Sequence, residues 1–107
     1  MKVNFKEVKV YLDMEKKVER VMNLQKDVAD AIYAKGTGAM GSSMANRVYE
    51  AKDGIVELNE YEVEHLRQVL NRSDLFVFAV EGLWKVLDEG GNVEETENKK
   101  ENKPTKK

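Results

Sequence analysis

The sequence predicts an α+β domain in which an N-terminal β-hairpin packs on about four α-helices, and three observations support this class. Residues 8–12 alternate between apolar and polar side chains, the period of a strand with one solvated face. Segments within residues 24–88 place apolar residues three and four apart, as on one face of a helix. The chain has 107 residues, of which 41% are hydrophobic, and this length suits one small domain.

The hairpin is predicted over residues 8–22. Val8, Val10 and Leu12 share one face of the first strand, and residues 16–22 return as the second strand after a turn. Residues 14–32 also fit a single helix, and this alternative stays open. Val3 and Phe5 alternate out of phase with Val8, which predicts a bulge or break at residues 6–7.

Two helices are predicted next. Asn23 is expected to cap a helix over residues 24–34, which a glycine-containing segment at residues 36–38 ends. A second helix is expected from Ser42 or Ser43 to Ala51. A short extended segment should follow at residues 55–58.

The third helix has the clearest start. Asn59 as N-cap and Glu62 three residues later resemble a capping box, and Leu58 with Val63 forms a hydrophobic staple. Val63, Leu66, Val69 and Leu70 then make an apolar stripe that predicts a buried helix face.

The last helix is predicted over residues 75–88, with Ser73 or Asp74 as its cap. It is apolar on most sides, so we expect it to lie centrally in the core or to pack on another chain. Gly82 in its middle costs about 1 kcal/mol relative to alanine, which a close neighbouring backbone would explain.

The C-terminal residues 90–107 are expected to be disordered. They hold a glycine pair, alternating acidic and lysine blocks, and Val93 as their one apolar residue. We therefore predict a single folded domain over residues 1–89.

Composition excludes several functional classes. The chain has no cysteine and one histidine, His65, which leaves almost no ligands for a zinc site. Residues 49–97 carry four Lys/Arg and thirteen Asp/Glu, an acidic balance that repels nucleic acid. The sequence has no secretory signal and no membrane span, so we expect a cytoplasmic protein that does not bind membranes. We expect no catalytic residue, cofactor or metal.

Residues 36–41 spell G-x-G-x-x-G, a pattern of dinucleotide-binding loops. Such a loop follows a buried strand, whereas an amphipathic helix end precedes this one. We interpret the segment as a loop between two helices.

The predicted function is a non-enzymatic protein-interaction module that binds a protein partner or a second copy of itself. The candidate interface lies on the last helix and consists of Phe76, Val80, Leu83 and Trp84. The alternative is a helix-turn-helix-like regulator that binds nucleic acid through Ser43, Asn46 and Arg47 on the helix at residues 43–51. The turn before that helix looks long for this motif, and the chain lacks a basic face.

Four segments carry a resemblance to a known group: VNFKEVKVYLD, DVADAIYAKG, ANRVYEAKDGIVELNEYEV and the lysine-rich end of the chain. Together they resemble small proteins encoded by bacteriophages and prophages, a group with no assigned activity. The resemblance implies an accessory protein in the cytoplasm of an infected bacterium.

Overall fold

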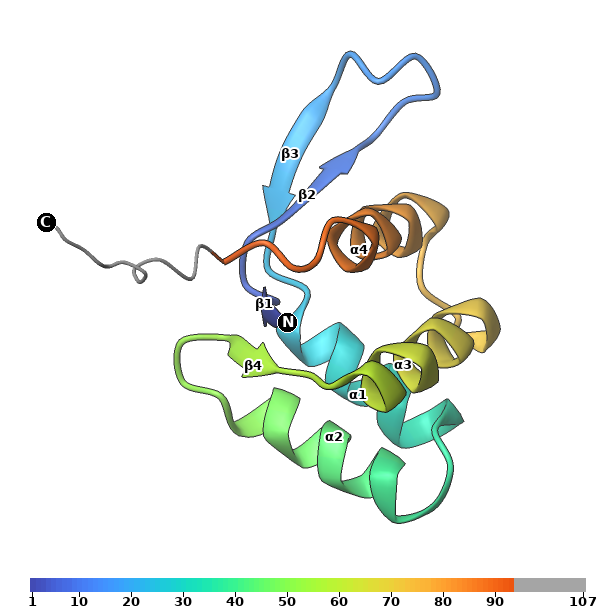
Figure 1. Cartoon of the computed structure of the whole chain (residues 1–107). Coiled ribbons are helices and arrows are strands. Elements are labelled where there is room, and N and C mark those ends of the chain that lie inside the picture. The colour runs from blue at the N-terminus through green and yellow to red at the C-terminus, as the bar shows by residue number, and fades with distance from the viewer. Residues whose placement is uncertain (94–107) are drawn as a thin grey trace, which may run out of the picture.

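A computed structural model describes residues 1–93 and has the predicted α+β architecture (Figure 1). Its described residues form two two-stranded antiparallel sheets, β1–β4 and β2–β3, and four helices. In chain order the elements are β1 (Lys2–Asn4), β2 (Val8–Tyr11), β3 (Glu19–Met22), α1 (Gln25–Lys35), α2 (Gly38–Glu50), β4 (Ile55–Glu57), α3 (Glu60–Arg72) and α4 (Val77–Asp88).

The predicted hairpin is confirmed as β2–β3, which pairs Val8 with Met22 and Tyr11 with Glu19. The Asp13 carboxylate closes its turn by accepting the backbone N–H groups of Lys17 and Val18, each at 2.9 Å. The hairpin therefore replaces the alternative of one long helix. It projects from the body of the molecule, and α4 crosses its base (Figure 1).

The predicted break at residues 6–7 is also confirmed, because β1 leaves the hairpin and pairs with β4 instead. Val3 lies opposite Val56, and both side chains are buried. The Phe5 N–H then donates to the Gly54 carbonyl oxygen at 2.9 Å, which extends this pairing. Sequence patterns had not predicted this second sheet.

Helices α1 and α2 lie side by side and are joined by a turn of only two residues, Gly36 and Thr37 (Figure 1). The predicted start of α2 at Ser42 or Ser43 is wrong, because the helix begins at Gly38. Gly41 is buried within α2, where an added Cβ would lie 3.2 Å from the carbonyl carbon of Gly36. Gly36 and Gly41 thus lie in close contact, and the turn packs tightly on the first turn of α2 instead of forming a loose loop.

The predicted caps of α1 and α3 have different outcomes. The Asn59 side chain accepts the Glu62 N–H, and the Glu62 carboxylate accepts the Asn59 N–H, each at 2.9 Å, so the capping box is confirmed. The N-cap of α1 is Leu24 rather than Asn23, although the Asn23 side chain still accepts the Gln25 N–H at 3.0 Å. The four apolar stripe residues of α3 are buried as predicted.

Helix α4 begins at Val77, two residues later than predicted, with Phe76 as its N-cap. Neither of the predicted caps, Ser73 and Asp74, is the N-cap of α4. Ser73 is the C-cap of α3, and its hydroxyl donates to the Leu70 carbonyl oxygen at 2.9 Å while accepting the Leu75 N–H at 3.4 Å. These bonds shape the corner between α3 and α4.

The folded part of the chain continues past the predicted boundary at residue 89. Gly91 forms a bridge with Lys2, and the Asn92 side chain accepts the Asn4 N–H at 2.7 Å. The Asn92 amide also donates to the carbonyl oxygens of Asn4 and Glu7. The prediction of disorder is therefore wrong for residues 90–93, because Asn92 supplies hydrogen bonds that hydropathy does not register. The rest of the predicted tail, residues 94–107, lies outside the described residues.

Candidate protein-binding surface

The four predicted interface residues occupy different environments. Phe76 is 73% exposed, whereas Val80 and Trp84 are half-buried and pack against the core. Leu83 is only 1% exposed, so its assignment to a binding surface is wrong. Its side chain is part of the core, and its neighbour Gly82 is the point at which α4 contacts β2. Of the four residues, Phe76 alone lies openly at the surface.

An exposed apolar patch surrounds Phe76 at the start of α4. The rings of Phe76 and Phe78 stack with their centroids 5.5 Å apart, and Val77 is also 73% exposed. Complete burial of one such side chain stabilises a fold by about 1.5–3 kcal/mol. This fold leaves most of that stabilisation unused at Phe76 and Val77, so both residues remain available to a partner.

A hollow of about 270 Å³ lies beside this aromatic pair. Its apolar lining comes from the end of the hairpin, the start of α1 and the beginning of α4, and consists of Met22, Leu24, Leu75, Phe76, Phe78 and Ala79. Asp27 and Asp74 complete the lining. The hollow therefore has apolar walls beside two acidic groups.

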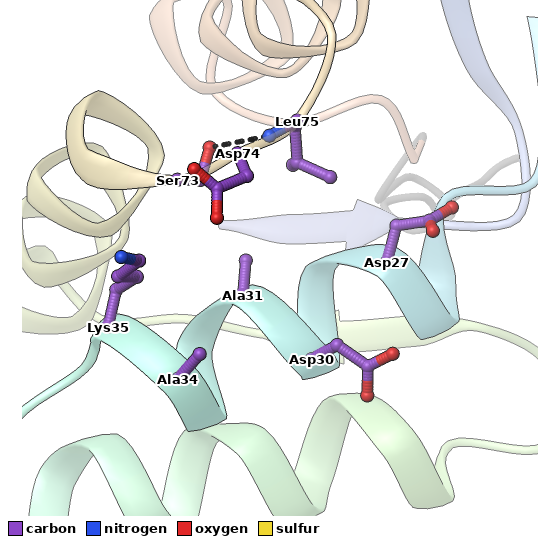
Figure 2. Close-up of a pocket in the computed structure, with 8 residues that line it drawn as sticks. All are labelled: Asp27, Asp30, Ala31, Ala34, Lys35, Ser73, Asp74 and Leu75. Carbon is purple, nitrogen blue, oxygen red and sulfur yellow. Dashed lines mark hydrogen bonds between the residues drawn. The ribbon is translucent and has the colours of Figure 1, made fainter.

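A second hollow, of about 240 Å³, continues along α1 (Figure 2). Both hollows share Asp27, Asp74 and Leu75 in their linings, so together they form one depression. In the second hollow Ala31 and Ala34 face the Ser73–Leu75 segment (Figure 2). We call the combined depression the α1 groove; its lining comes from residues 22–35 on one side and residues 73–79 on the other.

Carboxylates surround the α1 groove. Within residues 1–93, neither Asp27 nor Asp74 has an ion-pair partner. Asp30 lies 2.7 Å from Lys26, and this hydrogen bond, together with the charge of Asp30, raises the pKa of Lys26. Lys35 lies at the far end of the second hollow. The groove therefore has a net negative charge where the two hollows meet.

The acidic groups of the groove do not converge on one point. The carboxylates of Asp27 and Asp30 point to the right in Figure 2, whereas that of Asp74 points to the left. Throughout residues 1–93, no group of three or more His, Asp or Glu side chains is placed to hold a metal ion. The geometry suits recognition of charge better than acid–base chemistry, which needs groups converging on a reacting atom.

The residues of the nucleic-acid alternative lie on α2. Ser43 and Asn46 are exposed, but Arg47 is half-buried. Its guanidinium donates to the Glu57 carbonyl oxygen at 3.1 Å and forms an ion pair with the Glu62 carboxylate. Arg47 thus connects α2 to β4 and α3. The expectation of a long turn before α2 is also wrong, since two residues connect α1 and α2.

Most of the groove could not be predicted from the sequence, because its walls come from two segments, residues 22–35 and 73–79, that are distant in the chain. One local signal was available. Asp27, Ala31 and Ala34 have the spacing of one helix face, and alanines leave space where larger side chains would fill it. Only the folded chain shows that this face lies opposite the α3–α4 corner.

Comparison with known proteins gives no relative: no protein-family model, no curated protein and no solved structure matches this chain. Among residues 1–93, no helix is long and apolar enough to cross a membrane.

Proposed function

We propose that this chain is a non-enzymatic protein-interaction module that binds its partner through the α1 groove and the exposed Phe76 beside it. The observation that carries this proposal is the exposure of Phe76 and Val77 at the edge of a hollow with apolar walls. Aromatic side chains in such positions are frequent anchors of protein–protein interfaces. A partner that covers them would remove apolar surface from water.

Self-association through α4 has less support than binding of a different protein. Leu83 is in the core, and Val80 and Trp84 are half-buried, so most of the apolar surface that α4 offers a second copy comes from Phe76 and Val77. The nucleic-acid alternative also has less support, because the charged group of Arg47 is paired within the fold. On the resemblance to phage proteins alone, we propose the cytoplasm of an infected bacterium as the place of action.

The test compares Phe76→Ser with Tyr61→Ser as a matched control. Tyr61 is an aromatic residue that is 77% exposed on α3 and does not line the α1 groove. Each protein is used as bait in a bacterial lysate, and bound proteins are quantified by mass spectrometry. We expect Phe76→Ser to lose partners that the wild type and Tyr61→Ser both retain. Equal recovery by all three proteins would contradict the proposal.

A further inference from the structure

We infer that the partner segment in the α1 groove is a basic amphipathic helix, with an apolar anchor flanked by lysine or arginine. This inference rests on the proposed function and specifies the chemistry of the partner. Three properties of the groove lead to it: its apolar hollow, its carboxylates and the spacing of residues along α1.

The hollow beside the aromatic pair calls for an apolar anchor. Met22, Leu24 and Leu75 supply aliphatic walls, and the stacked rings of Phe76 and Phe78 form one side. A leucine, methionine or aromatic side chain entering the hollow would bury its own apolar surface together with that of Phe76. A negatively charged side chain there would lose hydration and would also meet the carboxylates of Asp27 and Asp74, which complete the lining.

The carboxylates beside the hollow call for basic flanking residues. Asp27 lies on the α1 side and Asp74 on the opposite side, so a segment lying between them would meet negative charge on both sides. Both carboxylates lack ion pairs within the described part of the chain. Basic residues on the partner, opposite these carboxylates, would increase the association rate and favour this partner over others.

The spacing of the groove residues favours a helical partner. Asp27, Ala31 and Ala34 recur about once per turn and line the α1 side of the groove. Asp27 and Ala34 are exposed, whereas Ala31 between them is buried, so the small side chains leave a shallow channel along this face. Helix α1 has 11 residues, which corresponds to a length of about 16 Å at 1.5 Å per residue. A helix of about three turns has the same length, and an amphipathic helix in a groove is a common mode of recognition.

Charge and composition argue against three other occupants of the groove: a second copy of the chain, the chain's own C-terminal residues, and a nucleic acid or membrane. A second copy bound through the same groove would place aspartates opposite aspartates. The chain's own residues 94–107 contain five lysines, four glutamates and no aliphatic or aromatic residue, so they offer little net charge and no anchor. Nucleic acids and anionic membranes would be repelled by Asp27 and Asp74.

The experiment selects a displayed library of random 14-residue peptides on the full chain, with counter-selection on Phe76→Ser. The affinity of each enriched peptide is then measured for the wild type, for Ala34→Met, which fills the groove, and for Asp27→Asn/Asp74→Asn. The control is Glu60→Gln/Glu64→Gln, which removes the same number of charges from exposed positions on α3 outside the groove.

The inference predicts peptides with a large apolar residue and Lys or Arg at helical spacing. Loss of the two aspartates should weaken their binding about five- to tenfold at low salt, and less at high salt, because exposed charges are screened. The glutamate control should bind as the wild type does. Ala34→Met should also weaken binding, since the added side chain occupies the groove.

The remaining outcomes separate the two claims. Peptides that need Phe76 for binding but contain no basic residue would overturn the inference and leave the proposed function intact. The same holds for peptides that bind Asp27→Asn/Asp74→Asn as tightly as the wild type. Enriched peptides that bind Phe76→Ser as well as the wild type, or a selection that enriches no peptide, would overturn both the inference and the proposed function. Stronger peptide binding by a chain ending at Val93 would identify residues 94–107 as the occupant of the groove. Self-association that Phe76→Ser abolishes would identify a second copy as the occupant. Either result would overturn the inference.

Discussion

The backbone of Gly82 in α4 lies directly against the carbonyl oxygen of Lys9 in β2. A Cβ at residue 82 would lie 2.7 Å from that oxygen and 2.8 Å from Cγ1 of Val10. This contact joins the last helix to the hairpin near the N-terminus, and it explains why a glycine is tolerated in the middle of α4. It also confirms the prediction that a neighbouring backbone approaches closely at this residue.

Gly82→Ala should therefore destabilise the protein, although alanine favours helices. The helix propensity gained is about 1 kcal/mol, whereas the overlap with β2 forces α4 away and typically costs about 1–3 kcal/mol. Urea denaturation should show a lower free energy of unfolding than for Glu81→Ala, an exposed neighbour in the same helix. An increase in stability would mean that α4 does not press against β2.

Leu83→Ala should cost about 2–5 kcal/mol of stability, because it creates a cavity at a fully buried position. Phe76→Ser should change stability far less, since Phe76 is mostly exposed. Thermal denaturation of both variants measures the difference. Similar losses for the two would show that Phe76 belongs to the core.

Arg47→Ala should reduce stability by about 1 kcal/mol, after allowance for the exposure of its side chain. The reason is that Glu62 loses its ion pair and the Glu57 carbonyl oxygen loses a donor. Denaturation measures this effect, and a gel-shift titration of labelled DNA at low salt tests the nucleic-acid alternative. A salt-dependent DNA shift that disappears in Arg47→Ala, with stability unchanged, would favour that alternative.

Asn92→Ala should lower the melting temperature because it removes three hydrogen bonds to residues 4 and 7. Each exposed bond of this kind contributes about 0.5–1.5 kcal/mol at most. A chain ending at Val93 should melt as the full chain does, whereas one ending at Glu89 should melt earlier. Equal melting of both truncated chains would restore the boundary predicted at residue 89.

Asn59→Ala should cost about 1 kcal/mol through loss of the α3 cap. The matched control is Asn71→Ala, an exposed asparagine in the last turn of the same helix, where alanine should be neutral or favourable. Chemical denaturation compares the two. If both variants unfold alike, the side chain of Asn59 does not hold the start of α3.

Features that depend on neighbouring residues could be predicted from the sequence, and features that depend on distant segments could not. The alternation of Val8 and Val10 predicts the hairpin, and Asn59 with Glu62 predicts the start of α3, because both patterns act within a few residues. Pairing of β1 with β4 joins residues more than 50 positions apart, and alternation alone does not specify the partner. The α1 groove has the same origin, since Asp27 and Asp74 become neighbours only after the α3–α4 corner forms.

The most direct test of the α1 groove as the binding surface is a map of backbone amide chemical-shift changes in the isotope-labelled full chain. The titrant is a peptide selected as above, with one apolar anchor and flanking lysines. The changes should concentrate at residues 22–35 and 73–79 and should be lost in Phe76→Ser. Changes concentrated instead at residues 43–47 of α2, or at residues 8–21 of the hairpin, would contradict the proposed binding surface.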